Sequence, residues 1–225
     1  MGLEDRRGVD TDVYQPAEDS HLLAQAACDR LTDDGNETRD DETRDGETRD
    51  GETRDDETRN DEPRDGATGP LVLEVGTGSG YVAGRIDAET SARVVAADLN
   101  PHAVRQAREK GLEAVRADLV APFADGAFDA VVFNPPYLPT DPENEWDDWM
   151  ERALSGGEDG RAVIDPFLAQ VGRVLAPDGV VYLLVSSLTG VDEVVEEAGE
   201  HGFSAVAIAD DSFPFETLTV LELLR

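Results

Sequence analysis

Lysine, cysteine and long apolar runs are almost absent from this chain. Lys110 is the one lysine among 225 residues, and Cys28 is the one cysteine. A single cysteine excludes an intrachain disulfide and a cysteine-rich zinc site. No apolar run reaches the roughly 18 residues of a membrane span, and residues 1–12 contain no apolar signal-peptide segment. We therefore expect a soluble, cytoplasmic protein that makes no membrane contact.

Positive charge is scarce as well. The chain has 19 Lys+Arg against 51 Asp+Glu, a net charge of −32. A general nucleic-acid surface needs a basic footprint, so this balance argues against such a role. Acidic surfaces keep proteins soluble in concentrated salt, where screening weakens self-repulsion. The charge therefore indicates a protein from a salt-rich, halophilic cytoplasm. It gives no information about the fold.

A five-residue repeat occupies residues 33–66. Its unit is Glu-Thr-Arg-Asp plus one variable residue, and the range contains no Val, Ile, Leu, Met or aromatic residue. Without apolar surface to bury, the segment cannot offset the entropy of ordering, so we expect disorder. Because loop-closure entropy grows slowly with length, a surface loop tolerates such an insert. We predict one domain over residues 1–225, interrupted by this insert; a binding tail is the alternative.

Residues 131–139 read Val-Val-Phe-Asn-Pro-Pro-Tyr-Leu-Pro. The apolar residues predict the end of a buried strand, and two consecutive prolines stop the ladder at Asn134. Pro135 and Pro136 fix two φ angles, so the Asn134 side chain and the Pro135 carbonyl are held rigidly, with Tyr137 beside them as a flat wall. Two acceptors beside an aromatic face suit a planar NH2 group. The alternative is a strand followed by a plain proline-rich turn.

The remaining pattern alternates strands and helices, which indicates an α/β fold. Strands are predicted at 71–75, 93–97, 113–117, 128–133, 180–185, 204–209 and 217–224, and helices at 22–31, 81–87, 101–110, 162–175 and 191–201. Pro177-Asp178-Gly179 is predicted to turn. Residues 138–160 are predicted to form a loop in which Trp146 and Trp149 belong to a substrate lid or pack into the core. Three scattered histidines give no metal site.

Polar side chains stand at the carboxyl ends of four predicted strands, where open α/β sheets bind ligands. They are Glu74, Asp98, Asp118 and Asn134. An acid inside an apolar strand, as at Glu74, is costly without a partner. Residues 76–80, Gly-Thr-Gly-Ser-Gly, turn the first strand into a helix and let the backbone approach a ligand. Residues 78–83 also fit the loose dinucleotide pattern, so a nicotinamide dehydrogenase is one alternative.

Two motifs carry a resemblance to a known family. Asn-Pro-Pro-Tyr after an apolar strand resembles the signature of class I methyltransferases that alkylate planar nitrogens. Residues 14–20, Tyr-Gln-Pro-Ala-Glu-Asp-Ser, are similar to a segment of the archaeal and eukaryotic release-factor glutamine methyltransferases, which are HemK/PrmC-related. Gly-Gly-x-x-Gly-Arg at 156–161 and Thr-Leu-Thr-Val-Leu at 217–221 resemble the same family. The resemblance implies a Rossmann-like, mostly parallel seven-stranded sheet with helices on both faces, and S-adenosyl-L-methionine as methyl donor.

The resemblance also implies roles for individual residues. The segment with Tyr14 and Ser20 would close over the donor, Glu74 would lie near its amino-acid moiety, and Asp98 would bind the ribose. Asp118 would meet the adenine amine and Leu119 the adenine ring. The expected donor site comprises Tyr14, Ser20, Glu74, Gly76, Gly78, Asp98, Asp118, Leu119 and Asn134, and the expected catalytic residues are Asn134, Pro135 and Tyr137.

The expected reaction is N5-methylation of the glutamine in the Gly-Gly-Gln loop of the class I translation release factor. An adenine-N6 methyltransferase acting on DNA or RNA, a protein lysine methyltransferase and a catalytically idle assembly partner are alternatives. In the family that the sequence resembles, a small zinc-binding activator adds a strand to the sheet edge. We expect it here along residues 112–117, with Leu112, Ala114 and Val115 as contact candidates.

Overall fold

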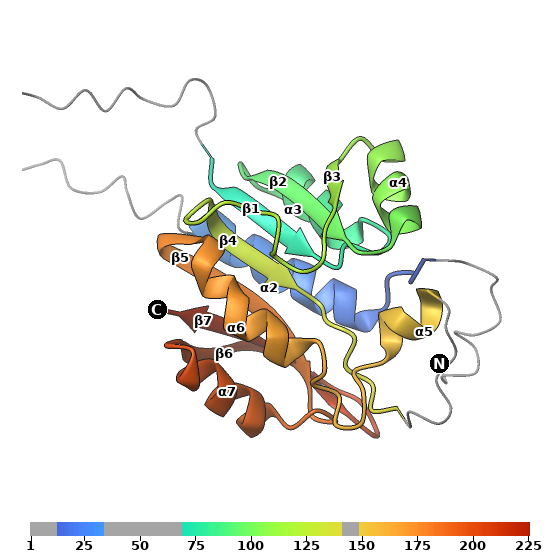
Figure 1. Cartoon of the computed structure of the whole chain (residues 1–225), viewed down its shortest axis with the longest axis vertical. Coiled ribbons are helices and arrows are strands. Elements are labelled where there is room, and N and C mark those ends of the chain that lie inside the picture. Colours follow the sequence, from blue (N-terminus) through green and yellow to red (C-terminus); the bar gives the residue numbers. More distant parts are fainter. Residues whose placement is uncertain (1–12, 34–68, 141–148) are drawn as a thin grey trace, which may run out of the picture.

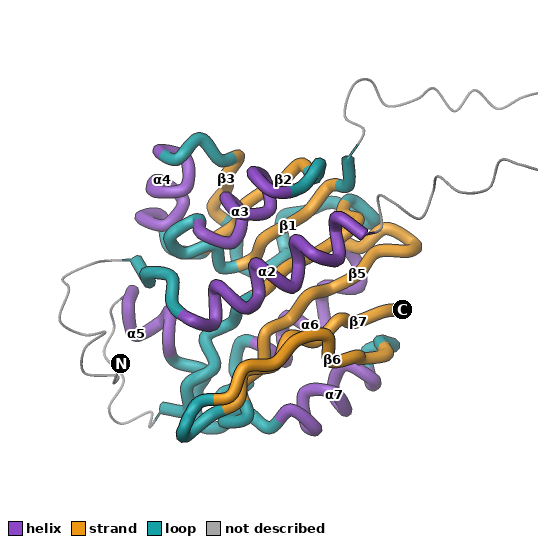
Figure 2. The backbone as a smooth tube through the Cα atoms, turned by 180° about the vertical axis from the view of Figure 1, so that it is seen from behind, coloured by secondary structure: helices purple, strands orange, loops and turns teal. Residues whose placement is uncertain are grey.

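The computed structural model describes residues 13–33, 69–140 and 149–225, and these form one twisted sheet covered by helices on both faces (Figures 1 and 2). The strands lie in the order β3-β2-β1-β4-β5-β7-β6. All neighbouring pairs are parallel except those made by β7, which runs antiparallel to β5 and to β6. The predicted mostly parallel seven-stranded α/β fold is confirmed. The Asp34–Gly66 part of the predicted insert and Trp146 lie outside the described residues.

The strands are β1 Leu71–Val75, β2 Arg93–Asp98, β3 Glu113–Arg116, β4 Phe128–Phe133, β5 Leu175–Ser186, β6 Ser204–Ser212 and β7 Thr217–Leu224. The helices are α2 Glu18–Asp33, α3 Tyr81–Glu89, α4 Pro101–Glu109, α5 Trp149–Leu154, α6 Ile164–Val174 and α7 Val191–Glu200. No helix in these ranges is long and apolar enough to cross a membrane.

Strand residues alternate between two apolar layers, because successive side chains point to opposite faces of a sheet. Val72 and Val132 pack with helices α2, α3 and α4 on one face. Leu73 and Phe133 pack with α6 and α7 on the other, where the rings of Phe133 and Phe167 lie 4.6 Å apart. Burial on both faces explains the nearly continuous apolar sequence of the central strands.

Two local predictions are wrong. A loop was predicted throughout residues 138–160, but Trp149–Leu154 form the short helix α5. The helix has only six residues and none of its side chains is buried. Its sequence therefore lacks the periodic apolar pattern by which longer helices are predicted. Strand β5 begins at Leu175, five residues before the predicted start at Val180. Its pairing with β4 shifts between Phe128 and Ala130, so the predicted turn lies in this irregular part of the strand.

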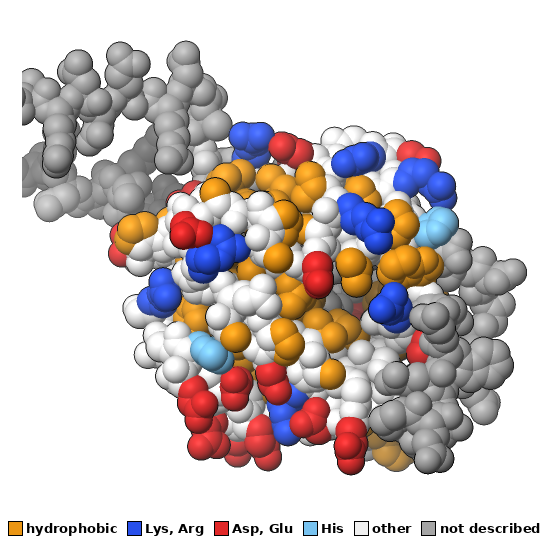
Figure 3. Space-filling model, viewed as in Figure 1, with side chains coloured by type: hydrophobic (Ala, Val, Ile, Leu, Met, Phe, Trp, Pro, Cys, Tyr) orange, Lys and Arg blue, Asp and Glu red, His pale blue; other side chains and the backbone are white. Residues whose placement is uncertain are grey.

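Acidic side chains gather over helix α7, as the red patch at the lower edge of Figure 3 shows. The helix sequence Val-Asp-Glu-Val-Val-Glu-Glu-Ala-Gly-Glu contains no lysine or arginine. Its apolar residues Val194 and Ala198 are fully buried, so the acids occupy the outward face. Like charges in adjacent turns of one helix repel each other unless salt screens them.

We therefore expect stability to depend on salt. Lowering the salt concentration from about 1 M to about 0.1 M lengthens the Debye length from about 3 to about 10 Å, and the melting temperature should fall by several degrees. Scanning calorimetry measures this. In a double variant with Glu193→Gln and Glu196→Gln, both on the exposed face of α7, the fall should be smaller. Equal melting temperatures at both salt concentrations would contradict the halophilic interpretation.

Candidate active site

A pocket of about 840 Å³ opens at the carboxyl ends of β1, β2 and β4. It lies where the chain connections diverge, since β2 and β3 extend the sheet on one side of β1 and β4 extends it on the other. Such a switch point is where open α/β sheets bind ligands. Every predicted site residue lines this pocket: Tyr14, Ser20, Glu74, Gly76, Gly78, Asp98, Asp118, Leu119, Asn134, Pro135 and Tyr137. Their individual roles remain predictions.

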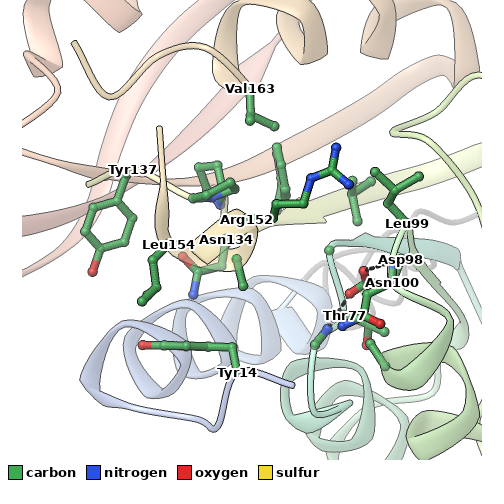
Figure 4. A pocket seen from close by; sticks show the side chains of 18 of the residues that line it. Tyr14, Thr77, Asp98, Leu99, Asn100, Asn134, Tyr137, Arg152, Leu154 and Val163 are labelled. Carbon is green, nitrogen blue, oxygen red and sulfur yellow. Dashed lines mark hydrogen bonds between the residues drawn. The ribbon is translucent and has the colours of Figure 1, made fainter. Parts of the chain in front are cut away.

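The glycine loop after β1 is fixed against the end of β2. The backbone N–H of Gly78 donates to Asp98 Oδ2 at 2.8 Å, and that of Asn100 donates to Asp98 Oδ1 at 2.8 Å (Figure 4). Gly76 and Gly78 have φ angles of +66° and +50°, a region that favours glycine. Asp98 is thus held by backbone groups at the pocket wall. Burial raises its pKa, even though these hydrogen bonds favour the charged form.

Glu74 is buried within strand β1, with an exposed fraction of 4%. The hydroxyl of Thr77 donates a hydrogen bond to it, which sequence reasoning did not foresee. Burial raises the pKa of Glu74 to about 8, and the nearby negative charge of Asp98 adds to this effect. A carboxyl in this setting is stabilised in its charged form by a cation. The sequence does not predict this contact of Thr77, because the turn after β1 brings the hydroxyl to Glu74 only in the folded chain.

The charges around the pocket suit a cationic ligand. Among the described residues that line it, one arginine, Arg152, stands against five acids: Asp19, Glu74, Asp98, Asp118 and Glu151. S-adenosylmethionine carries a sulfonium and an ammonium group, so an acidic pocket in which Asp19 and Glu74 are buried fits this donor. Arg152 lies 5.5 Å from the ring of Trp149, and both belong to α5, the helix that the sequence did not predict.

The tip of β3 forms another wall of the pocket. The N–H of Ala117 donates to the Asp98 carbonyl at 3.0 Å, which places Asp118 and Leu119 beside β2. Leu119 has φ +47°, the one positive φ among the described non-glycine residues. A leucine in this conformation is strained, and such strain clusters at functional sites.

Asn134 lies at the end of β4 with an acceptor available. Its Oδ1 atom is buried and has no hydrogen-bond partner among the described residues. Buried polar atoms nearly always have a partner, so this atom marks a place for a donor group. In Figure 4 Asn134 lies near the rings of Tyr14 and Tyr137. Asn134, which carries the predicted acceptor group, lines the same pocket as the acids.

Helix α5 is joined to the exit of the Asn-Pro-Pro-Tyr segment. The N–H of Leu138 donates to the Leu154 carbonyl at 3.0 Å, and the N–H of Gly156 donates to the Leu138 carbonyl at 2.9 Å. Trp149, Leu154 and Ser155 line the pocket, so residues of the predicted loop do reach the site. For Trp149 this agrees with a place near the substrate; a lid function stays a prediction.

Together the fold and the pocket define a class I S-adenosylmethionine-dependent methyltransferase. Residues 72–156 match the family model described as "Methyltransferase domain". The chain is 35% identical over 160 residues to a protein of Methanocaldococcus jannaschii that is provisionally named a protein N5-glutamine methyltransferase, covering 68% of this chain and 81% of that protein. It is 28% identical to human methyltransferase HEMK2 over 97% of this chain and 92% of that protein.

A solved structure is also similar to this chain. The E. cuniculi Mtq2–Trm112 complex, responsible for methylation of the eRF1 translation termination factor, contains a chain with 27% identity and a TM-score of 0.65. The match covers 96% of this chain and 99% of that one. The chain therefore belongs to the HemK/PrmC-related family of protein N5-glutamine methyltransferases, as the sequence motifs predict. A nicotinamide dehydrogenase, one of the alternatives, is wrong.

The pKa of Glu74 makes donor binding dependent on pH. With a pKa of about 8, the ligand-free carboxyl is mostly protonated at neutral pH, whereas a bound cation favours the charged form. As pH rises from about 6 to about 8, the Kd for S-adenosylmethionine should fall about tenfold. Titration calorimetry measures this, and Glu74→Gln should flatten the profile. The matched variant Glu196→Gln, on the exposed face of α7, should keep it.

The same group predicts how stability changes with pH in the absence of donor. The folded-state pKa of about 8 lies above the ordinary value of 4.5, so the folded protein holds a proton that the unfolded chain loses. The contribution of Glu74 to the free energy of unfolding should therefore decrease as pH rises between these two values. If Glu74→Gln leaves both profiles unchanged, Glu74 is not the group responsible.

Proposed function

We propose that this chain transfers a methyl group from S-adenosylmethionine to N5 of the glutamine in the Gly-Gly-Gln loop of the class I release factor, in the cytoplasm. The observation that carries this proposal is the buried Asn134 Oδ1 without a partner in the donor-binding pocket. A primary amide offers the N–H that this atom lacks. The names of the related proteins, which include protein N5-glutamine methyltransferases, support the same substrate.

The chemistry requires precise placement of a weak nucleophile. The nitrogen of an amide has a delocalised lone pair, so it reacts only when held in line with a good methyl donor. Asn134 Oδ1 and the Pro135 carbonyl would accept the two N–H groups of the glutamine amide and favour positive charge developing on its nitrogen. Tyr137, 5% exposed, would limit the movement of the amide plane. No general base is needed before methyl transfer: the N–C bond forms as the C–S bond breaks, and the surplus N–H proton then leaves to solvent.

The donor side is assigned to residues that already hold their positions. S-adenosylmethionine supplies a methyl group attached to a sulfonium, which leaves as a neutral thioether. Glu74 would hold its amino-acid moiety, Asp98 its ribose, and Asp118 with Leu119 its adenine. The backbone of the glycine loop would approach the donor closely, because its glycines carry no side chain. None of these residues has to move a proton during the transfer.

A partner along strand β3 belongs to the same proposal. β3 is the last strand in the sheet order, so one of its sides has no neighbouring strand. Such an edge can be extended by another chain. We assign it to a small zinc-binding activator, supported by the related Mtq2–Trm112 complex. Of the predicted contact candidates, Ala114 is covered by the chain's own core at 4% exposure, whereas Leu112 and Val115 are partly exposed.

Light scattering tests the partner. Mixing the chain with the cognate activator should give the mass of a one-to-one complex and lower the Kd for S-adenosylmethionine, because Asp118 and Leu119 directly follow the extended strand. A charged residue on this edge, Val115→Lys, should prevent the complex, whereas Val206→Lys on the opposite edge strand β6 should not. An active monomer whose mass and Kd do not change on mixing would contradict it.

Asn134→Ala tests the acceptor site. The variant loses one of the two amide acceptors, so methyl transfer to the release factor should fall by at least about a hundredfold. The Kd for S-adenosylmethionine should change by less than about fivefold, because the donor keeps its other ligands. Radiolabelled methyl transfer and calorimetry on the same preparation give both values. Turnover within about tenfold of the unaltered protein would remove Asn134 from catalysis.

The choice of acceptor separates the remaining alternatives. Release factor with Gln→Asn in the Gly-Gly-Gln loop should receive no methyl group, because the shorter amide does not reach Asn134. A DNA or RNA oligonucleotide and a lysine-rich protein serve as competing substrates. Faster transfer to adenine or to lysine would replace the proposed substrate while leaving the class of enzyme intact.

A further inference from the structure

Asp19 is a buried carboxylate of the pocket to which neither the sequence motifs nor the proposed mechanism assigns a role. It lies in the first turn of α2 and is 4% exposed. Oδ1 accepts hydrogen bonds from the backbone N–H of Ser20 at 2.6 Å and from the Ser20 hydroxyl at 3.2 Å. Oδ2 accepts from the Tyr14 hydroxyl at 3.0 Å and from the Tyr137 hydroxyl at 3.4 Å.

These contacts join two segments that lie far apart in the sequence. Tyr14 and Ser20 belong to the segment expected to close over the methyl donor, whereas Tyr137 ends the Asn-Pro-Pro-Tyr motif that holds the acceptor. Both tyrosines line one pocket, and Asn134 lies near their rings (Figure 4). Asp19 Oδ2 thus accepts hydrogen bonds from both segments: from Tyr14 on the side of the methyl donor and from Tyr137 on the side of the methyl acceptor.

The number of hydrogen bonds that the Asp19 carboxylate can accept argues against its binding a ligand directly. A carboxylate offers about four acceptor sites, and four donors already contact Asp19. To bind the ammonium group of S-adenosylmethionine, Asp19 would have to release one of these hydrogen bonds. Asn134 differs, because its Oδ1 has no partner among the described residues. The geometry therefore favours Asp19 acting through the tyrosines.

We infer that Asp19 is a positioning residue that couples the donor-side segment to the acceptor motif by holding Tyr14 and Tyr137 on one carboxylate oxygen. The inference rests on the proposed function for the identity of the acceptor. Ordering of residues 14–20 over a bound donor fixes Asp19, and Asp19 fixes the Tyr137 ring beside Asn134. The acceptor site is thus completed when the donor site is covered.

The carboxylate accepts hydrogen bonds from all four neighbouring groups. An asparagine at this place could keep its Oδ1 on the Ser20 N–H only with its NH2 group toward the tyrosine hydroxyls, which would then accept instead of donate. A charged acceptor also makes stronger hydrogen bonds than an amide oxygen does. Asp19→Asn therefore alters the contact with almost no change in size, and Tyr14→Phe and Tyr137→Phe each remove one hydroxyl while keeping the ring.

The experiment is a mutant cycle with two readouts, carried out on the full chain together with its activator. The Kd for S-adenosylmethionine is measured by calorimetry without any acceptor protein, and kcat and KM are measured with the release factor. Asp19→Asn should raise this Kd by about threefold to tenfold and lower kcat by about tenfold or more. Asp29→Asn, the same change at an exposed position of α2 outside the pocket, should alter both by less than about twofold.

The cycle shows whether Asp19 acts through the tyrosines. In a Tyr14→Phe, Tyr137→Phe background, Asp19→Asn should have less than about a third of its effect on kcat in the unaltered protein, because the contacts are already gone. Full additivity would overturn the inference, since Asp19 would then act independently of both rings. Unchanged Kd and kcat in Asp19→Asn would overturn it as well.

Two further controls address misfolding of Asp19→Asn and an incorrect choice of methyl acceptor. If Asp19→Asn does not fold, the two phenylalanine variants still decide, because coupling predicts that Tyr137→Phe on the acceptor side changes the Kd of the donor. An unchanged donor Kd in Tyr137→Phe rejects the coupling. Failure of the release factor to accept a methyl group from the unaltered protein would reject the proposed function alone, since the donor measurements need no acceptor.

Discussion

The parallel register between β1 and β4 determines where the two substrates can meet. Val75 pairs with Phe133, so the next residues along the two strands, Gly76 and Asn134, leave the sheet side by side. A Cβ atom at Gly76 would lie 3.8 Å from the Asn134 carbonyl. A shift of one residue would reverse the faces of a whole strand and separate the glycine turn from the acceptor motif. The two-faced core of the sheet prevents that shift.

Electrostatics at this edge supports a cationic donor. Glu74 and Asp98 are held by strand ends at low exposure, and burial raises the pKa of each. Keeping two carboxyls in such a place has a free-energy cost. In the proposed function the ammonium group of the methyl donor would offset this cost at Glu74, and the ribose hydroxyls would donate hydrogen bonds to Asp98. The acceptor side differs, since the proposed acceptor groups, Asn134 Oδ1 and the Pro135 carbonyl, are neutral oxygens.

Much of this arrangement could be predicted from the sequence. Strand periodicity and the stop at Pro135 place Asn134 at a strand end, and the parallel topology brings the ends of β1, β2 and β4 to one edge. Side chains that depend on tertiary contacts could not be predicted. Arg152 reaches the pocket from a six-residue helix without a buried side chain. The contact of Asp19 with Tyr137 spans 118 residues, and no local pattern encodes it.

The most direct test of the proposed reaction is made in cells. Release factor is isolated from a strain with this gene and from a strain without it, and mass spectrometry locates the methyl groups. We expect one methyl group on the glutamine of the Gly-Gly-Gln loop in the first strain, none in the second, and its return with the intact gene but not with Asn134→Ala. A glutamine equally methylated in both strains would contradict the proposed function.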